Sequence, residues 1–259
     1  MNFSNLLKRP LYRTPRLLSA IMRLKPHWNR ETYVFLNTIR RGDFVVDVGA
    51  NLGHYAEVFA RLVGPSGRVD AFEPVPSTCA LLEQRLRRWP YAKIHNFAVS
   101  DQLGEVVLTL PAADSGQASL RPHHAGTWAA NPSVTQHHAK AITLDHWADS
   151  AGWPRVDFLK LDIEGAELLA LRGATTLVRR QQPLLFIEVW QEWLKDFGLT
   201  PQDLARWLRE HGYDRFLMVG DTLTPLPDLE NAWATHLLRG SHNILAGQSA
   251  CHAGRWPGW

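Results

Sequence analysis

The sequence predicts an α/β fold in which helices cover both faces of a mostly parallel central sheet. Short apolar runs rich in β-branched residues alternate with segments of helical periodicity, and the first such run is Phe44–Val48. Strands that alternate with helices are joined by right-handed crossovers, which gives a parallel sheet between two layers of helices. The chain has 259 residues, 45% of them hydrophobic and 20% charged, as expected for one large globular domain.

The expected elements can be placed in order along the chain. Strands are expected at residues 44–48, 68–72, 92–99, 106–110, 156–161, 183–189, 216–219 and 243–245. Helical patterns follow at residues 55–62, 77–86, 166–171 and 201–211. Residues 111–140 are expected to form a loop, and residues 250–259 a poorly ordered tail. We divide the chain into a basic helical appendage (1–35), a main domain (36–248) and a C-terminal tail (249–259).

The N-terminal stretch is basic and amphipathic. Seven lysines and arginines precede the first acidic residue, Glu31, and apolar residues lie between them. Such a segment either contacts an anionic membrane surface or packs on the domain as a helix with its basic face in water, and we favour the packed helix. No apolar run approaches the roughly 18–20 residues that span a bilayer. With only two cysteines, we expect a cytoplasmic protein, and peripheral membrane contact is the alternative.

The residues that follow the first two strands point to a nucleoside ligand. In such a sheet, ligands bind outside the carboxyl ends of the strands. Gly49 and Gly53 follow the first strand and allow a tight turn, although their spacing differs from the dinucleotide fingerprint and a structural turn is the alternative. Glu73 follows the second strand and could accept hydrogen bonds from two ribose hydroxyls, or could be a solvated carboxylate. Together, the two features favour the nucleoside interpretation.

The sequence also resembles a known family, the FkbM-type methyltransferases. Four blocks within residues 40–190 carry the resemblance: Asp47-Val-Gly-Ala-Asn-Leu-Gly53, Ala71-Phe-Glu-Pro74, Asn96-Phe-Ala-Val-Ser-Asp101 and Lys160-Leu-Asp-Ile-Glu-Gly-Ala-Glu167. The resemblance implies a class I methyltransferase fold of Rossmann-like type with S-adenosylmethionine as cofactor. It also implies methyl transfer to a hydroxyl oxygen, often on a sugar or a polyketide-like scaffold.

The resemblance assigns cofactor-binding roles to individual residues. The methionine part would be held by residues of the first block, namely Asp47, Gly49, Asn51 and Gly53. Glu73 would bind the ribose, and Ala98 and Val99 would border the adenine ring. Acceptor specificity is expected outside the match, in residues 1–35, 111–140 and the region after residue 189.

Carboxylates at the ends of two later strands are the candidates for catalysis. Asp162 could bind the cofactor's ammonium, serve as the base or hold a divalent cation, and Glu188 could complete a Mg²⁺ site. Glu164 is a second catalytic candidate. Glu164 and Glu167 could instead stabilise a helix through its dipole, which we favour for Glu167.

Several histidines and aromatic residues are weaker candidates. A histidine could be the general base, but solvated loop histidines or a packed helix residue are the favoured interpretation of His54, His123, His124, His137 and His138. The chain has 11 tryptophans, and their flat faces could pack on sugar rings if they are not simply core residues. Those near the expected site are Trp128, Trp147, Trp190 and Trp193. Ser119 and Leu120 could border the acceptor pocket.

Three other functions are compatible with a nucleotide-binding α/β fold. A nucleic-acid methyltransferase would use the basic N-terminus, but Asp162-Ile-Glu-Gly165 stands where a base-methylating motif would lie, so we expect no nucleic-acid partner. A non-catalytic nucleotide-binding scaffold would have no need of the complete set of glycines and acids. A dehydrogenase is disfavoured by the glycine spacing. The expected acceptor is a small molecule, sugar or glycan.

Overall fold

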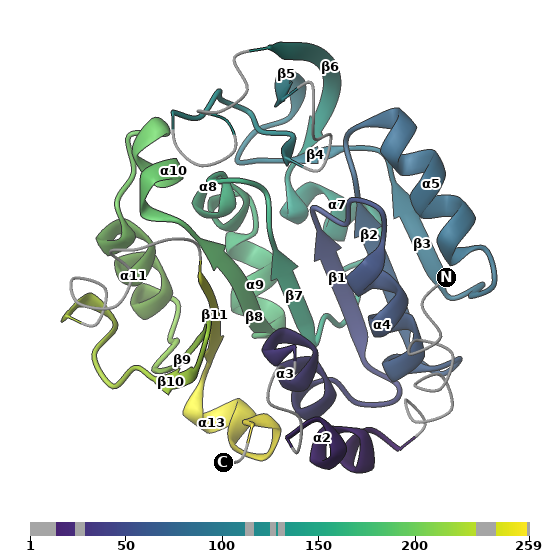
Figure 1. The fold of residues 1–259 in the computed structure, drawn as a ribbon, viewed down its shortest axis with the longest axis vertical. Helices are drawn as coiled ribbons and strands as arrows, with labels where there is room; N and C mark the ends of the chain where they lie inside the picture. The colour runs from purple at the N-terminus through teal and green to yellow at the C-terminus, as the bar shows by residue number, and fades with distance from the viewer. Residues whose placement is uncertain are drawn as a thin grey trace.

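The computed structural model describes residues 14–23, 29–111, 117–124, 128, 133–231 and 242–257. It contains an eight-stranded sheet of order β10-β9-β11-β8-β7-β1-β2-β3 (Figure 1). The strands from β8 to β3 pair in parallel, whereas β11 is antiparallel to both β8 and β9. The predicted α/β class with a mostly parallel sheet is therefore confirmed.

The strands of this sheet are β1 (Phe44–Val48), β2 (Arg68–Phe72), β3 (Ala92–His95), β7 (Phe158–Leu161), β8 (Leu184–Val189), β9 (Arg215–Val219), β10 (Leu223–Pro225) and β11 (His242–Gly247). A second, three-stranded sheet of order β4-β6-β5 consists of β4 (Ala98–Val99), β5 (Gly104–Pro111) and β6 (Val134–Ile142). The helices are α2 (Pro15–Arg23), α3 (Arg30–Thr38), α4 (His54–Val63), α5 (Pro76–Leu86), α7 (Leu144–Ser150), α8 (Glu167–Arg172), α9 (Thr175–Gln181), α10 (Gln191–Asp196), α11 (Pro201–Glu210) and α13 (Ser249–His252).

The central strands are apolar throughout because both faces of the sheet are buried. Successive side chains of a strand point to opposite faces. Val45 and Phe158 therefore pack in one cluster with residues of α2, α3 and α4. Val46 and Leu159 pack in the other cluster, with residues of α7, α8, α9 and α11. At the centre of the first cluster, the ring of Phe35 on α3 makes edge contacts with neighbouring aromatic rings.

The second sheet corrects two expectations. The expected loop at residues 111–140 is wrong in its last part, because Val134–Ile142 pairs antiparallel with Gly104–Pro111. Much of β6 is exposed, so it lacks the apolar alternation that marks a half-buried strand. The expected strand at residues 92–99 is divided in two. The side-chain amide of Asn96 donates to the carbonyl oxygens of Glu73 and Pro74 at the division, and the chain then enters β4, which pairs with β6.

Both described ends of the chain pack on the main domain. Leu18 of α2 is buried, whereas Leu17 and Ile21 are 52% and 36% exposed. Instead of an irregular tail, residues after β11 form α13, and Arg255 beyond it donates to both carboxylate oxygens of Asp43 at 2.7 and 2.9 Å. The division at residues 35 and 248 stays a prediction, and residues 1–13 and 24–28 of the basic stretch lie outside the description. In the part of the chain that the structure describes, no helix has the length and apolar character to cross a membrane.

Candidate active site

The turn after β1 is built from left-handed backbone and fits closely against its neighbours. Gly49 and Gly53 have φ of 75° and 76°, which glycine adopts without strain, and Asn51 has φ of 48°. A Cβ atom on Gly49 would lie 1.9 Å from the carbonyl oxygen of Asp162. The amides of Gly49 and Ala50 donate to the carbonyl oxygen of Phe72 at the end of β2. The two strand ends are thereby fixed side by side.

Glu73 lies at this junction and is only 5% exposed. Its Oε2 accepts the amide of Asn51 at 2.9 Å, and its Oε1 accepts the amide of Val75 at 2.9 Å. Burial raises the pKa of Glu73 to about 7, although the two amides oppose the shift. The predicted ribose-binding carboxylate therefore has a fixed orientation in the described structure.

An apolar pocket lies beside Glu73. Its lining includes Gly49, Phe72, Pro74 and Phe97 at the ends of central strands, Ala98, Val99 and Leu108 from the second sheet, and Ala118 and Leu120 from the segment after β5. The pocket has an empty volume of about 330 Å³, part of it open to solvent. The structure thus brings Ala98 and Val99, predicted to border adenine, to the same pocket as the glycine turn. Leu120, predicted at the acceptor, also lines this pocket.

Lys160 is a buried cation that the sequence analysis did not single out. Its Nζ lies 3.1 Å from Asp47 Oδ1 and 3.1 Å from Asp162 Oδ2, and it donates to the carbonyl oxygen of Gly49 at 3.3 Å. Burial opposes its charge, but the carboxylates of Asp162 and Asp47 outweigh that effect and raise the pKa of Lys160. Asp47 is fully buried behind the turn. A lysine inside an otherwise apolar strand was the signal, because a buried charge needs a partner.

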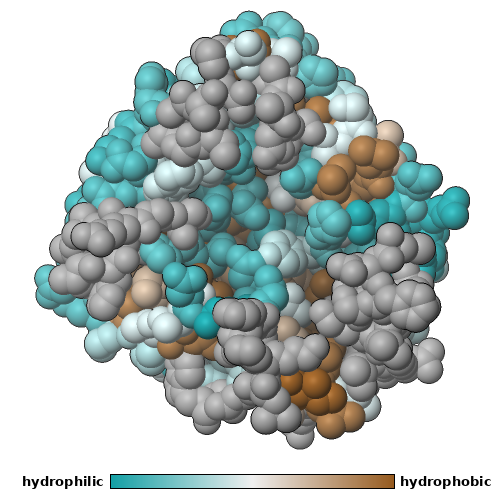
Figure 2. Space-filling view, viewed as in Figure 1, coloured by the Kyte–Doolittle hydropathy of each residue, from teal (hydrophilic) through white to brown (hydrophobic). Residues whose placement is uncertain are grey.

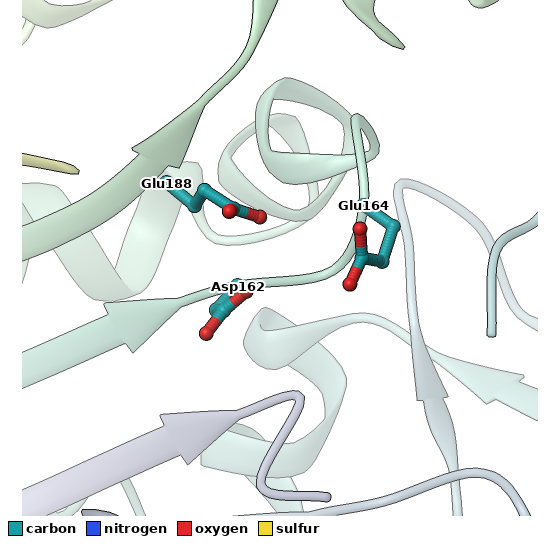
Figure 3. A group of neighbouring side chains, drawn as sticks. All are labelled: Asp162, Glu164 and Glu188. Carbon is teal, nitrogen blue, oxygen red and sulfur yellow. The ribbon is translucent and has the colours of Figure 1, made fainter. Parts of the chain in front are cut away.

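Three carboxylates come together at the ends of β7 and β8. Asp162, Glu164 and Glu188 are half-buried, and each offers a carboxylate oxygen within 4.8 Å of the others (Figure 3). Such a set of hard oxygen ligands could hold a divalent cation. Glu167 does not join them. It lies buried in the first turn of α8, where its Oε1 accepts the amides of Ile163 and Gly165 at 2.9 and 3.2 Å.

Glu31 is a fourth carboxylate near this group, and sequence analysis missed it as a site residue. It lies in the first turn of α3, and its Oε1 accepts the side-chain amide of Asn243 at 2.6 Å. Asn243 on β11 is the register partner of Glu188 on β8. Burial and the nearby charge of Asp162 raise the pKa of Glu31. The face of the molecule seen in Figure 2 is mainly hydrophilic at its centre.

The histidines differ in their positions. His123 is buried, with Nε2 2.8 Å from the carbonyl oxygen of Glu164 and Nδ1 2.8 Å from Asp196 Oδ2. His124 contacts the same aspartate but its side chain is 84% exposed. His137 and His138 lie on β6, and His54 is exposed in the first turn of α4.

The tryptophans also separate into two groups. Trp147 contacts the rings of Phe44 and Phe72 in the core. Trp193, in contrast, stacks on His123 with ring centroids 4.6 Å apart, and Trp190 lies 4.4 Å from Trp193. Trp128 meets His123 edge-on. Three of the four tryptophans therefore form an aromatic group around a histidine that contacts Glu164.

Relatives of this chain are found among curated proteins and solved structures. The hexuronic acid methyltransferase AglP of Haloferax volcanii is 27% identical over 179 residues, which cover 68% of this chain and 66% of that protein. The 31-O-demethyl-FK506 methyltransferase FkbM of Streptomyces tacrolimicus is 43% identical over 67 residues, which cover 26% of this chain and 25% of that protein. The chain spans less than two thirds of the length of either protein.

The fold and the family are supported independently. A crystal structure of methyltransferase FkbM from Methylobacillus flagellatus aligns with a TM-score of 0.50 at 17% identity, covering 92% of this chain and 58% of that one, and supports the fold. Residues 47–215, more than half of the chain, match the model of the methyltransferase FkbM domain. The resemblance seen in the four sequence blocks is thus confirmed, and the chain belongs to the FkbM methyltransferase family.

Proposed function

We propose that this protein transfers a methyl group from S-adenosylmethionine to a hydroxyl oxygen of a small molecule or glycan. The observation that carries the proposal is Glu73, oriented by the amides of Asn51 and Val75 at the edge of an apolar pocket. Each carboxylate oxygen keeps a lone pair that can accept a ribose hydroxyl. The adenine ring suits the apolar pocket, and Gly49, which lines the same pocket, lies where the methionine part would follow.

The acids beside this pocket supply the groups that the reaction needs. S-adenosylmethionine, when bound, supplies an electrophilic methyl group. Asp162 is the proposed base that takes the proton from the acceptor hydroxyl, and Glu164 is the second carboxylate that orients the acceptor. The side chain of Asp162 is 31% exposed, so an acceptor can reach it, and Lys160 fixes one of its oxygens. Orientation and a positioned base are together sufficient for large rate gains.

Mg²⁺ is a further proposed component of this site. Asp162, Glu164 and Glu188 would hold it, because their oxygens lie within 4.8 Å of one another and are hard ligands. Its chemistry there would be to acidify the acceptor hydroxyl, and in that case Asp162 would serve as a ligand instead of as the base. If this proposal is correct, a chelator abolishes methyl transfer and Mg²⁺ restores it. If methyl transfer is undiminished in the presence of the chelator, the Mg²⁺ proposal is rejected and the three carboxylates act without a metal.

The acceptor is proposed to be a sugar or a similar hydroxyl-bearing ring. Two relatives are named for a hexuronic acid and for a demethylated FK506, which is consistent with such an acceptor. Trp190 follows Glu188 at the end of β8 and is half-buried, so part of its ring can pack against an acceptor.

We also propose a cytoplasmic location with peripheral membrane contact through residues 1–30. Leu17 and Ile21, one helical turn apart on α2, are exposed, and Figure 2 has a hydrophobic patch at the lower edge over α2. The surrounding sequence is basic, as an anionic lipid surface requires. Deletion of residues 1–30 should abolish binding to vesicles of phosphatidylserine and phosphatidylcholine. Equal binding by the full and shortened chains would reject this role.

The main proposal is tested by calorimetry with S-adenosylmethionine on the wild type and on Glu73→Ala. We expect binding near micromolar, or about −8 kcal/mol, in the wild type and much weaker binding in the variant. Glu83→Ala is the matched control, because Glu83 is an exposed glutamate on α5. The absence of binding in folded wild type would favour the scaffold function instead.

A further inference from the structure

The loop that carries Asp162 and Glu164 has an unusual backbone that must be held in place. Glu164 has φ of 58°, in the left-handed region that non-glycine residues rarely adopt. On one side, buried Glu167 accepts the amides of Ile163 and Gly165. On the other side, the carbonyl oxygen of Glu164 accepts the hydroxyl of Ser119 at 3.0 Å and contacts His123 Nε2 at 2.8 Å. Because a carbonyl oxygen only accepts, Nε2 is the donor.

His123 is itself fixed on all sides. Its side chain is fully buried, and its Nδ1 lies 2.8 Å from Asp196 Oδ2. Its ring stacks on Trp193 with an interplanar angle of 16°, and Trp128 meets it at 85°. Asp196 and Trp193 both belong to α10, the helix that follows β8 and Glu188. One imidazole therefore links residues 117–124, the Asp162–Gly165 loop and α10.

We propose that His123, with Ser119, is a positioning residue that holds the Asp162–Gly165 loop in the conformation required for methyl transfer. It acts through the carbonyl oxygen of Glu164, and it is not the base, since both ring nitrogens are engaged by Asp196 and Glu164. The inference rests on the proposed function for its consequence in catalysis. Its structural part, the dependence of the loop on the Nε2 contact, stands on the distances alone.

Two conservative substitutions separate the two contacts of His123. A glutamine amide reaches the position of Nε2, so His123→Gln keeps a donor for Glu164. An asparagine amide reaches only the position of Nδ1. His123→Asn therefore keeps a polar group next to Asp196 and loses the hydrogen bond to the carbonyl oxygen of Glu164. His124→Asn is the matched control, because His124 contacts the same aspartate, Asp196, and its side chain is exposed.

Hydrogen exchange of the backbone amides of residues 163–166 is the first measurement, because it needs no acceptor. We expect these amides to exchange about tenfold faster in His123→Asn than in wild type, because a tenfold change corresponds to the free energy of one lost hydrogen bond. In His123→Gln and His124→Asn, the exchange rates should equal those of wild type. Ser119→Ala, a smaller change, should shift exchange in the same direction. Equal exchange in the Asn and Gln variants would overturn the inference.

Binding and turnover then connect the loop to the reaction. In all variants, the calorimetric Kd for S-adenosylmethionine should change much less than kcat, because Glu73 and the amides of Asn51 and Val75 are unaltered, although Ala118, Leu120 and Ile163 line the pocket. With methyl glucuronide as the acceptor probe, kcat should fall about tenfold in His123→Asn and recover in His123→Gln. Failure of wild type to bind S-adenosylmethionine would reject the proposed function, whereas unchanged exchange in His123→Asn would reject the inference.

Discussion

The proposed cofactor side and the proposed acceptor side of the site are built in different ways. On the cofactor side, Gly49, Asn51 and Glu73 come from two neighbouring strand ends, and the binding groups are fixed by backbone hydrogen bonds. On the acceptor side, Glu31 and Glu188 come from elements far apart in the sequence, and side chains hold one another in place. Local backbone geometry requires particular residues at a fixed spacing, so it can be recognised in the sequence as a motif. An assembly of side chains from distant elements has no such spacing and cannot be recognised in this way. Four experiments address this difference, from the largest expected effect to the smallest.

The largest effect is expected on the acceptor side, in Asp162→Asn. Removal of a base from a proton transfer lowers the rate by roughly 10²–10⁴-fold. The amide keeps the shape of the side chain, so the circular dichroism spectrum should be unchanged while methyl transfer is lost. Glu192→Gln is the control, since Glu192 is an exposed acid on α10. Wild-type turnover in Asp162→Asn would remove Asp162 from the mechanism.

The second effect is on stability and concerns Lys160, which connects the two sides. Lys160→Met leaves Asp47 buried without its cation, and a buried charge deprived of its partner costs roughly 3–5 kcal/mol. The free energy of unfolding, measured with urea, should fall by that amount. Lys93→Met is the control, since Lys93 is an exposed lysine on β3, and it should change the free energy of unfolding little. An unaltered unfolding midpoint in Lys160→Met would mean that the pair is not structural.

The third effect is a pH dependence of cofactor binding. Burial raises the pKa of Glu73 to about 7 in the free protein. Ribose hydroxyls donate to the ionised carboxylate, so binding below that pKa requires loss of a proton. Affinity should therefore be constant above pH 7 and weaken by up to about tenfold per unit as the pH falls below it. Calorimetry at about pH 8 and about pH 6 measures this, and Glu73→Gln should abolish the dependence.

The smallest effect separates the two sides directly. Trp190→Ala removes a half-buried ring beside Glu188, and loss of one stacking contact of about 1 kcal/mol should raise the KM of a sugar acceptor about fivefold. The Kd for S-adenosylmethionine should not change, because Trp190 is not part of the apolar pocket. Trp89→Ala is the control, with a ring that contacts Arg61 instead. A change in Kd alone would place Trp190 on the cofactor side.

Most of the fold could be predicted from the sequence, and the exceptions share a cause. Strands buried on both faces, such as β1 and β8, are marked by continuous apolar runs. The exposed strand β6 has no such mark, since its polar side chains face water and only pairing with β5 makes it a strand. The helical end of the chain was missed for a similar reason. It is held by long-range contacts that no local pattern reveals, among them the ion pair of Arg255 with Asp43 and the contact of His252 with the carbonyl oxygen of Gln182.

The sequence by itself determined the fold class and the family, and it predicted the residues of the proposed cofactor side, because glycine turns and strand-end acids are local features of the backbone. Only the tertiary structure decided that Lys160 lies between Asp47 and Asp162, and that Glu31 lies near Glu188. It also decided that His123 is a buried contact of the Glu164 carbonyl oxygen rather than a solvated histidine. Apart from Lys160 with Asp162, which are close in sequence, these pairings bring together residues separated by 41 to 212 positions, and such contacts form only when the sheet and its helices are packed.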